Sequence, residues 1–298
     1  MSQLTLTGCG PSASPPNYWT FQVVTTAAGE TFALQAVGVN AGKTCVVDWG
    51  DGSASQNWTG QALRSHVYAA TGTYTVTVTN ALEIFRIEMQ DAKTLWTVSN
   101  AAPIPKNLTS LALYNLPNLT WDVGCMAGGN MPVNLTMLYL YNLTGLTWDV
   151  GSSVGANMPA NLTALTLNSL TGLTWDVGSN VGANMPIGVV VLNLIGCSAI
   201  MIDATDVLPK PLTIFRFENH LTQAQVDAVL AALYLAFPTR TGTNGTIDLA
   251  GGGNAAPSGT APGSAQCPPA TGWNTAYELV HDSCNVSPKH WASVTCQT

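Results

Sequence analysis

The stretch NLTSLALYNLPNLTWDVG, residues 107–124, decides the fold because it returns twice with few changes. It reads NLTMLYLYNLTGLTWDVG over residues 134–151 and NLTALTLNSLTGLTWDVG over residues 161–178, a step of 27 residues. A repeat of about 20–29 residues with one leucine spacing is typical of a solenoid, in which stacked coils bury a continuous core. Three near-identical units therefore occupy residues 107–133, 134–160 and 161–187.

The leucines within each unit follow the pattern L-x-x-L-x-L, which resembles the leucine-rich repeat family. The units depart from that family after the central strand, where a buried Asn or Cys is usual and where they have Leu116, Leu143 and Leu170. The buried Asn ladder of the family is therefore expected to be missing. The resemblance implies a β-solenoid over residues 81–220, in which degenerate coils flank the three regular ones.

A second repeated segment, Leu-Thr-Trp-Asp-Val, alternates apolar and polar residues and predicts a short strand on the opposite side of each coil. Leu119, Trp121 and Val123 should face the core, whereas Thr120 and Asp122 should face solvent. Equivalent carboxylates would then stack at about 4.8 Å per coil, where like charges repel. Turn amides, a cation or basic groups of a neighbouring chain are the alternatives that would compensate them. The column consists of Asp122, Asp149, Asp176 and Asp203.

The apolar period changes after the solenoid. Residues 222–237 place their apolar side chains on one helical face, and Thr222 with Gln225 forms a capping box. We expect this helix to cap the solenoid. The remainder of residues 221–298 is rich in Gly, Pro and Ser and is expected to be loop-rich, apart from an edge strand at residues 247–249.

Residues 19–80 alternate short apolar runs with turn residues, the pattern of a small β-sandwich, and residues 1–18 precede them as an N-terminal arm. Three spaced motifs in the segment resemble a PKD-type, immunoglobulin-like domain: WGDG at residues 49–52, H-x-Y at residues 66–68 and G-x-Y-x-V at residues 72–76. The fold class is therefore mainly β, with a PKD-like β-sandwich followed by a leucine-rich-repeat solenoid and its capping helix.

The PKD resemblance carries its own expectations for the WGDG turn. It implies that Asp51 and Gly52 make a tight turn, that Trp49 packs into the core, and that Tyr68 or Tyr74 pins a corner. Asp48 and Asp51 are expected to stabilise the turn through their own side chains. Calcium binding by these hard oxygen ligands is the alternative.

Composition excludes several classes of function. The formal net charge is −7, so phosphate backbones would be repelled and nucleic-acid binding is not expected. The longest apolar runs fall short of the roughly 18–20 residues of a spanning helix, so membrane insertion is not expected. The N-terminal residues also lack the basic and apolar stretches of a secretory leader.

No catalytic constellation emerges from the sequence. The four histidines stand at no spacing typical of a metal site or a catalytic triad, so we expect no catalytic residue, no metal and no cofactor. They are His66, His220, His281 and His290. A carbohydrate-active enzyme would need paired carboxylates, and the nearest candidates, Glu83 and Glu88, lie in the strands that enter the solenoid.

The solenoid is poor in charge, because residues 107–200 contain no Lys, Arg or Glu and only three Asp. Mixed surface charge keeps proteins apart, so a surface of this kind is expected to contact a partner. Tyrosines beside Asn and Thr suit sugar stacking or a neutral protein contact, and simple coverage of strands by β-formers is the alternative. The partner- or glycan-binding face is predicted at Ala112, Tyr114, Tyr139, Tyr141, Thr166, Asn168 and Asn193.

Seven cysteines are too few and too scattered for a disulfide framework. Four of them lie in segments with little predicted structure and are candidates for disulfides or cross-links between chains: Cys9, Cys267, Cys284 and Cys296. Cys45 and Cys197 lie in apolar segments and are expected to be small buried hydrophobes.

The order of segments is similar to that of chains among tailed-bacteriophage virion proteins and BspA-like bacterial surface proteins. That resemblance implies a non-enzymatic virion structural protein, exposed on the particle as a capsid decoration or a tail-associated protein. Its partners would be other virion proteins in homo-oligomeric or lattice contacts, and a host-surface glycan in adhesion. The alternative is a bacterial cell-surface adhesin that binds glycan or host protein.

Overall fold

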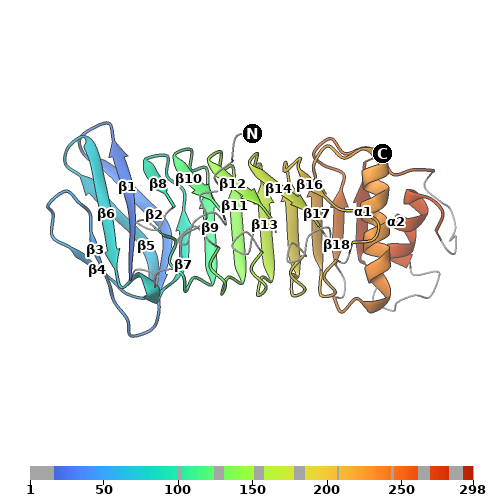
Figure 1. Ribbon diagram of the computed structural model, residues 1–298, viewed down its shortest axis with the longest axis horizontal. Coiled ribbons are helices and arrows are strands. Elements are labelled where there is room, and N and C mark those ends of the chain that lie inside the picture. The colour runs from blue at the N-terminus through green and yellow to red at the C-terminus, as the bar shows by residue number, and fades with distance from the viewer. Residues whose placement is uncertain are drawn as a thin grey trace, which may run out of the picture.

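The computed structural model is an elongated, mainly β molecule whose strands lie across its long axis, with two helices at the C-terminal end (Figure 1). The structure describes residues 17–98, 103–123, 131–150, 158–177, 185–206, 208–242, 245–260, 269–281 and 291–297. Of the N-terminal arm expected at residues 1–18, residues 1–16 lie outside the described residues.

The first six strands pair antiparallel within two layers. The predicted alternation of this segment is confirmed, since β1 buries Trp19, Phe21 and Val23 and leaves the residues between them partly exposed. The strands are β1 (Tyr18–Thr25), β2 (Glu30–Val39), β3 (Cys45–Asp48), β4 (Gln56–Trp58), β5 (Gln61–Tyr68) and β6 (Gly72–Thr79).

The solenoid follows, and each coil contributes one long and one short strand. The long strands are β7 (Ile84–Met89), β9 (Ser110–Tyr114), β11 (Met137–Tyr141), β13 (Ala164–Asn168), β15 (Val191–Ile195) and β17 (Ile214–Glu218). The short strands are β8 (Thr94–Thr97), β10 (Leu119–Asp122), β12 (Leu146–Asp149), β14 (Leu173–Asp176) and β16 (Ile200–Met201). The predicted short strand on the opposite side of each repeated unit is therefore confirmed.

The two sides of the coil differ in register. In the long sheet Met137 pairs with Ser110, a step equal to the 27-residue repeat, so equivalent side chains form straight columns. In the short sheet Trp121 pairs with Leu146, so equivalent residues move two positions along the strand with every coil. The same repeated sequence therefore gives straight columns of equivalent residues in the long sheet and a two-residue stagger between neighbouring strands in the short sheet.

Both sheets run from the first six strands into the solenoid without a break. β1 pairs with β8 and β2 pairs with β7, which extends the short and the long sheet respectively. The short sheet has the order β16-β14-β12-β10-β8-β1-β6-β3-β4, and the long sheet has the order β19-β18-β17-β15-β13-β11-β9-β7-β2-β5. The chain is therefore one continuous two-layered body across residue 80.

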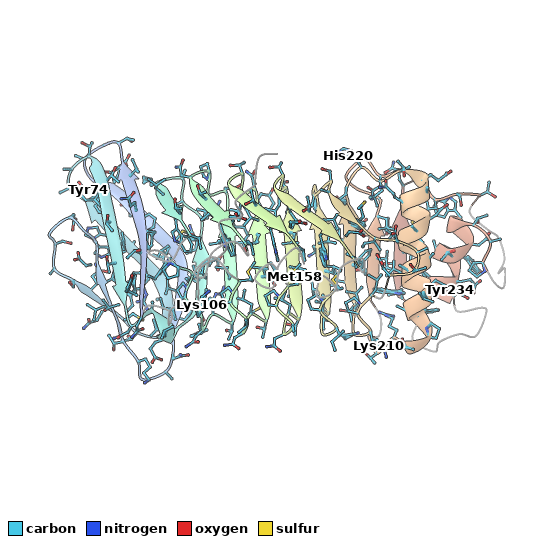
Figure 2. The ribbon with its side chains drawn as sticks, viewed as in Figure 1. Tyr74, Lys106, Met158, Lys210, His220 and Tyr234 are labelled. Atoms are coloured by element: carbon cyan, nitrogen blue, oxygen red, sulfur yellow. The ribbon has the colours of Figure 1, made fainter. Side chains whose placement is uncertain are left out.

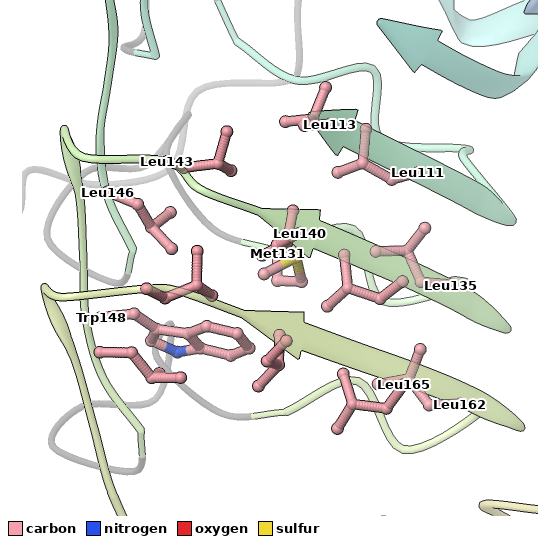
Figure 3. Packing of buried hydrophobic residues seen from close by; sticks show 14 of the residues in the cluster. Leu111, Leu113, Met131, Leu135, Leu140, Leu143, Leu146, Trp148, Leu162 and Leu165 are labelled. Carbon is pink, nitrogen blue, oxygen red and sulfur yellow. The ribbon is translucent and has the colours of Figure 1, made fainter. Parts of the chain in front are cut away.

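Leucines of successive coils form the core of the solenoid. Figure 3 shows Leu113 and Leu140 on neighbouring long strands pointing into the same interior, with Trp148 entering from the opposite side. Leu116, Leu143 and Leu170, which follow the long strands β9, β11 and β13, are buried as well. Three buried indoles recur with the repeat: Trp121, Trp148 and Trp175.

The turn after each long strand uses the left-handed backbone region. Asn115, Asn142 and Ser169 have φ near +50° (49°, 49° and 53°), which Asn tolerates better than most residues. The Asn115 N–H donates to the Tyr141 carbonyl at 2.9 Å, and the Asn142 N–H donates to the Asn168 carbonyl at 2.9 Å. Each turn is thereby hydrogen-bonded to the next coil.

The helix predicted at residues 222–237 is confirmed as α1 (Gln223–Ala236), and its capping box joins Thr222 and Gln225. The strand expected at residues 247–249 is confirmed as β18 (Thr246–Leu249). Its expected place at an edge is wrong, because β18 pairs parallel with β17 on one side and with β19 on the other. The expectation of a loop-rich remainder missed α2 (Gly272–His281) and β19 (Ser293–Cys296). β19 depends on its pairing with β18, which no local pattern reveals. α2 packs against α1, and its local signals were missed: the Asn274 N–H donates to the Thr271 hydroxyl at the first turn, and Thr275, Ala276 and Leu279 are buried on one helical face.

Candidate interaction face

The outer face of the long sheet carries the residues predicted to bind a partner, in two straight columns. One column passes from Ala112 through Tyr139 and Thr166 to Asn193. The other passes from Tyr114 through Tyr141 to Asn168. The register therefore brings all seven predicted residues together on four adjacent strands, which we call the neutral face.

Exposure within the neutral face is uneven. Tyr141 is its most exposed tyrosine, with 39% of its surface accessible. The expectation that Ala112 is exposed is wrong, because its accessible surface is only 6%. Its methyl group lies in register between Glu88 and Tyr139, whose longer side chains cover it.

The charge pattern gives this face its boundaries. The outward positions of β9, β11, β13 and β15 carry no charged side chain. On the N-terminal side, Arg86 pairs with Glu88 at 2.8 Å. On the C-terminal side, Arg216 pairs with Glu218 at 3.2 Å and with Asp248 at 3.3 Å. The outward charges next to the neutral face thus have partners of their own.

The polar groups of the face are partly engaged with one another. The Asn193 side-chain amide donates to the Thr166 hydroxyl at 3.2 Å, so the two side chains are held along their column. Burial raises the pKa of the Tyr114 phenol, and the nearby carboxylate of Glu88 raises it further. Tyr114 is therefore a neutral hydroxyl at physiological pH.

The corner before each long strand has the same charge pattern as the neutral face, with charged residues at the two ends and uncharged residues between them. The residue after the corner proline is Lys106 in the first coil and Lys210 in the last, and Figure 2 labels both. Between them the same position is apolar, with Val133 71% and Ile187 83% exposed. The uncharged surface therefore extends from the strand face around this corner.

The Asp column does not stack as the sequence suggests. Because of the stagger in the short sheet, Asp122 pairs with Thr147 and Asp149 pairs with Thr174. The Thr174 hydroxyl donates to an Asp149 carboxylate oxygen at 2.8 Å. Threonines thus separate the carboxylates. Within the described ranges no group of three or more His, Cys, Asp or Glu side chains is arranged to hold a metal ion.

The WGDG turn is a network of local hydrogen bonds. The Gly50 N–H donates to Asp48 at 2.8 Å and the Ser53 N–H donates to Asp51 at 3.0 Å, in agreement with the turn-stabilising role expected of both aspartates. The Tyr68 hydroxyl donates to the Trp49 carbonyl at 3.2 Å, and Trp49 is fully buried.

His66 contacts the same turn, although the spacing of the histidines in the sequence predicted no partner for it. Its Nε2 lies 2.7 Å from Asp51 Oδ2, and its ring stacks on Trp49 at 4.8 Å. Desolvation raises the pKa of Asp51, but hydrogen bonds from Ser53 and His66 outweigh it and lower that pKa to about 2. The alternation of β5, which turns His66 towards the interior, is the sequence signal that links it to the turn.

The other histidines lie on separate elements. His220 occupies a turn with φ +55°, and His281 stacks on Tyr277 in α2. His290 lies outside the described residues.

An apolar cavity of ≈ 240 Å³ between β16 and α1 has Asp203 and Gln225 as its polar lining residues.

Among the cysteines, Cys45 and Cys197 are fully buried, which confirms their expected role as small hydrophobes. Burial raises the pKa of Cys45 to about 11, so its thiol stays protonated. Cys296 is a free, buried thiol in β19, and its cross-linking stays a prediction. The other three candidates for cross-links, Cys9, Cys267 and Cys284, lie outside the described residues.

Comparison of the chain with protein-family models, with curated proteins and with solved structures gave no match. Within the part of the chain that the structure describes, no helix is long and apolar enough to cross a membrane.

Proposed function

We propose that the chain is a non-enzymatic structural protein of a tailed-phage virion, exposed on the particle as a capsid decoration or a tail-associated protein. In this proposal the first six strands are a PKD-like domain and the coils are divergent leucine-rich repeats. The neutral face binds other virion proteins, and in adhesion it binds a host-surface glycan.

The observation that carries the proposal is the uncharged outer face of four adjacent strands, bounded on both sides by ion pairs. A neutral partner can bury such a face without stripping water from unpaired charges, which is the costly step in desolvation. Tyrosines are common anchors of protein interfaces because they bury a large ring and keep a polar hydroxyl. A stable protein contact is therefore physically accessible to this surface.

The test places one charge on the face and follows particle occupancy. Tyr141→Lys introduces an unpaired ammonium into the neutral face, and it should lower the number of copies on purified particles at least several-fold. Leu95→Lys is the matched control, because Leu95 is 38% exposed and lies on β8 of the opposite sheet. Equal occupancy for both variants and the wild type would contradict the proposed role of the face, and absence of the wild-type protein from particles would contradict the virion proposal.

The second candidate is a bacterial cell-surface adhesin that binds glycan. It is favoured by Tyr139 and Tyr141, which share a strand face with Asn168 and so offer ring faces beside a hydrogen-bonding amide. Binding of uncharged oligosaccharides to the purified protein, lost in Tyr139→Ala and retained in Leu95→Ala, would show that the face binds glycan. Such binding supports the cell-surface adhesin over the virion protein only if the wild-type protein is also absent from purified particles.

A further inference from the structure

The N-terminal end of the long sheet exposes an edge strand. β5 is the last strand of that sheet, and among the described residues it pairs only with β2. The N–H groups of Gly29 and Val39 in the neighbouring segment donate to the carbonyls of Tyr68 and Gly60 at 2.9 Å each. Alternate residues of an antiparallel strand direct their backbone N–H and C=O groups to opposite sides. Gly60 and Tyr68 direct their carbonyls towards β2. The backbone groups of Leu63, Ser65 and Val67, which alternate with them, therefore point to the open edge.

β5 lacks the devices that usually protect an edge strand. Such strands carry an exposed charge, a proline or a bulge that prevents pairing with another chain. Leu63 and Val67 are 62% and 57% exposed, and the strand contains no proline. The bulge at this end lies in β2, where the register shifts between Leu34 and Val37, and it leaves β5 regular.

The charged groups of β5 are turned inward. Arg64, its one Lys or Arg, lies 5.7 Å over the Trp58 ring and donates to the Thr59 carbonyl at 2.6 Å. His66 faces the interior and contacts Asp51. The two basic and three acidic residues of segment 17–80 give it a net charge of −1, compared with −7 for the chain. Two copies that approach through this end therefore meet little repulsion.

The outward residues of β5 are symmetric about Ser65. In an antiparallel pair centred on Ser65, Leu63 faces Val67 of the second copy and Val67 faces its Leu63, and apolar cross-strand pairs of this kind are stabilising. We propose that β5 pairs with β5 of a second copy across a two-fold axis at Ser65, which joins the two long sheets into one. This contact goes beyond the proposed function and does not depend on the neutral face.

The first experiment measures the mass of the full-length protein in solution by light scattering. The wild type should be a dimer at micromolar concentration, and Leu63→Lys and Val67→Lys should be monomers because they place charge opposite an apolar partner. Leu235→Lys is the matched control: Leu235 is 57% exposed, like Val67, but lies on α1. It should leave the dimer intact, and unchanged circular dichroism and melting temperature should show that all three variants fold.

The second experiment tests the register with cysteines under mild oxidation. Directly opposed residues lie about 5.5 Å apart between Cα atoms, which suits a disulfide. Ser65→Cys alone should therefore form a covalent dimer. Leu63→Cys and Val67→Cys should cross-link when mixed but much less when each is alone, because like residues lie about 14 Å apart along the strand. The wild-type protein under the same conditions controls for its own thiols.

Three results would overturn the proposal. They are a monomeric wild type, a dimer that persists in both Leu63→Lys and Val67→Lys, and a dimer that Leu235→Lys also abolishes. The proposal is also wrong if the protein is a monomer and an extended segment of a different protein, in place of a second copy, pairs with β5.

Discussion

Gly50 turns the chain within the WGDG loop, at φ +76°, with the backbone of Thr75 directly against its Cα. A methyl group there would collide with the Thr75 carbonyl oxygen and would also force a side chain into the left-handed region, which costs about 1–2 kcal/mol for a non-glycine residue. We therefore expect Gly50→Ala to lower the free energy of unfolding by more than about 2 kcal/mol.

Urea unfolding measures this loss, and Gly42→Ala is its control. Gly42 has a similar φ of +73° but open space around it, so only the conformational cost of about 1–2 kcal/mol applies. Equal losses in the two variants would show that the close approach to Thr75 has no energetic weight.

Asp51 makes stability depend on pH. Its folded pKa of about 2 lies below the value of about 3.9 in an unfolded chain, so its contribution is complete above pH 4 and is lost as the pH falls towards 2. Asp51→Asn should therefore be less stable than the wild type at pH 7, by at most about 2 kcal/mol, and the difference should shrink between pH 4 and pH 2. Melting temperatures across this range measure it, and a difference that is constant with pH would contradict the role of the carboxylate.

At the scale of the element, α1 offers a direct measurement of a cap. The Thr222 hydroxyl accepts the Gln225 N–H, and the Gln225 side chain accepts the Thr222 N–H. Thr222→Ala should cost about 1 kcal/mol of stability, the usual value of a lost N-cap. Thr222→Ser keeps the hydroxyl and should be close to wild type in thermal unfolding. If both variants melt alike, the cap does not stabilise the helix.

The sequence predicted those elements whose signal is local. The alternation in Leu-Thr-Trp-Asp predicted the short strands, and the capping box predicted α1, because each depends on neighbouring residues only. β19 escaped prediction because its partner strand is distant in sequence. α2 was missed although Thr271 caps its first turn and its apolar residues recur at helical spacing. The stagger of the short sheet likewise depends on the path of the coil, so the threonines beside Asp122 and Asp149 were not foreseen.

The candidate face was predictable in its position but only partly in its accessibility. The leucine spacing fixes which residues point outward, and the register brought all seven together. The lengths of neighbouring side chains decide exposure, which is why Ala112 is covered while Tyr141 is open. The exposed edge of β5 depends on the order of strands in the sheet, and the sequence carries no direct sign of it.

For the whole molecule, the identical register of the coils predicts that one unit is dispensable. Removal of residues 134–160 joins Val133 to Asn161 and lets β9 pair with β13 through the same columns. The shortened protein should fold, with a longest dimension reduced by about 4.8 Å, as measured by small-angle X-ray scattering. Removal of residues 134–146 alone deletes half a coil and should unfold the solenoid. A full-unit deletion that fails to fold would contradict the independence of the units.

The direction of the strands also decides how the rod responds to force. Since the strands lie across the long axis (Figure 1), the hydrogen bonds between coils run along that axis. A pulling force between the two ends stretches these hydrogen bonds directly and separates the coils one after another. A push along the axis, or flow across the side, presses the coils together or spreads the strain over many bonds. A molecule built in this way resists compression along its axis and forces on its side. It resists tension between its two ends poorly.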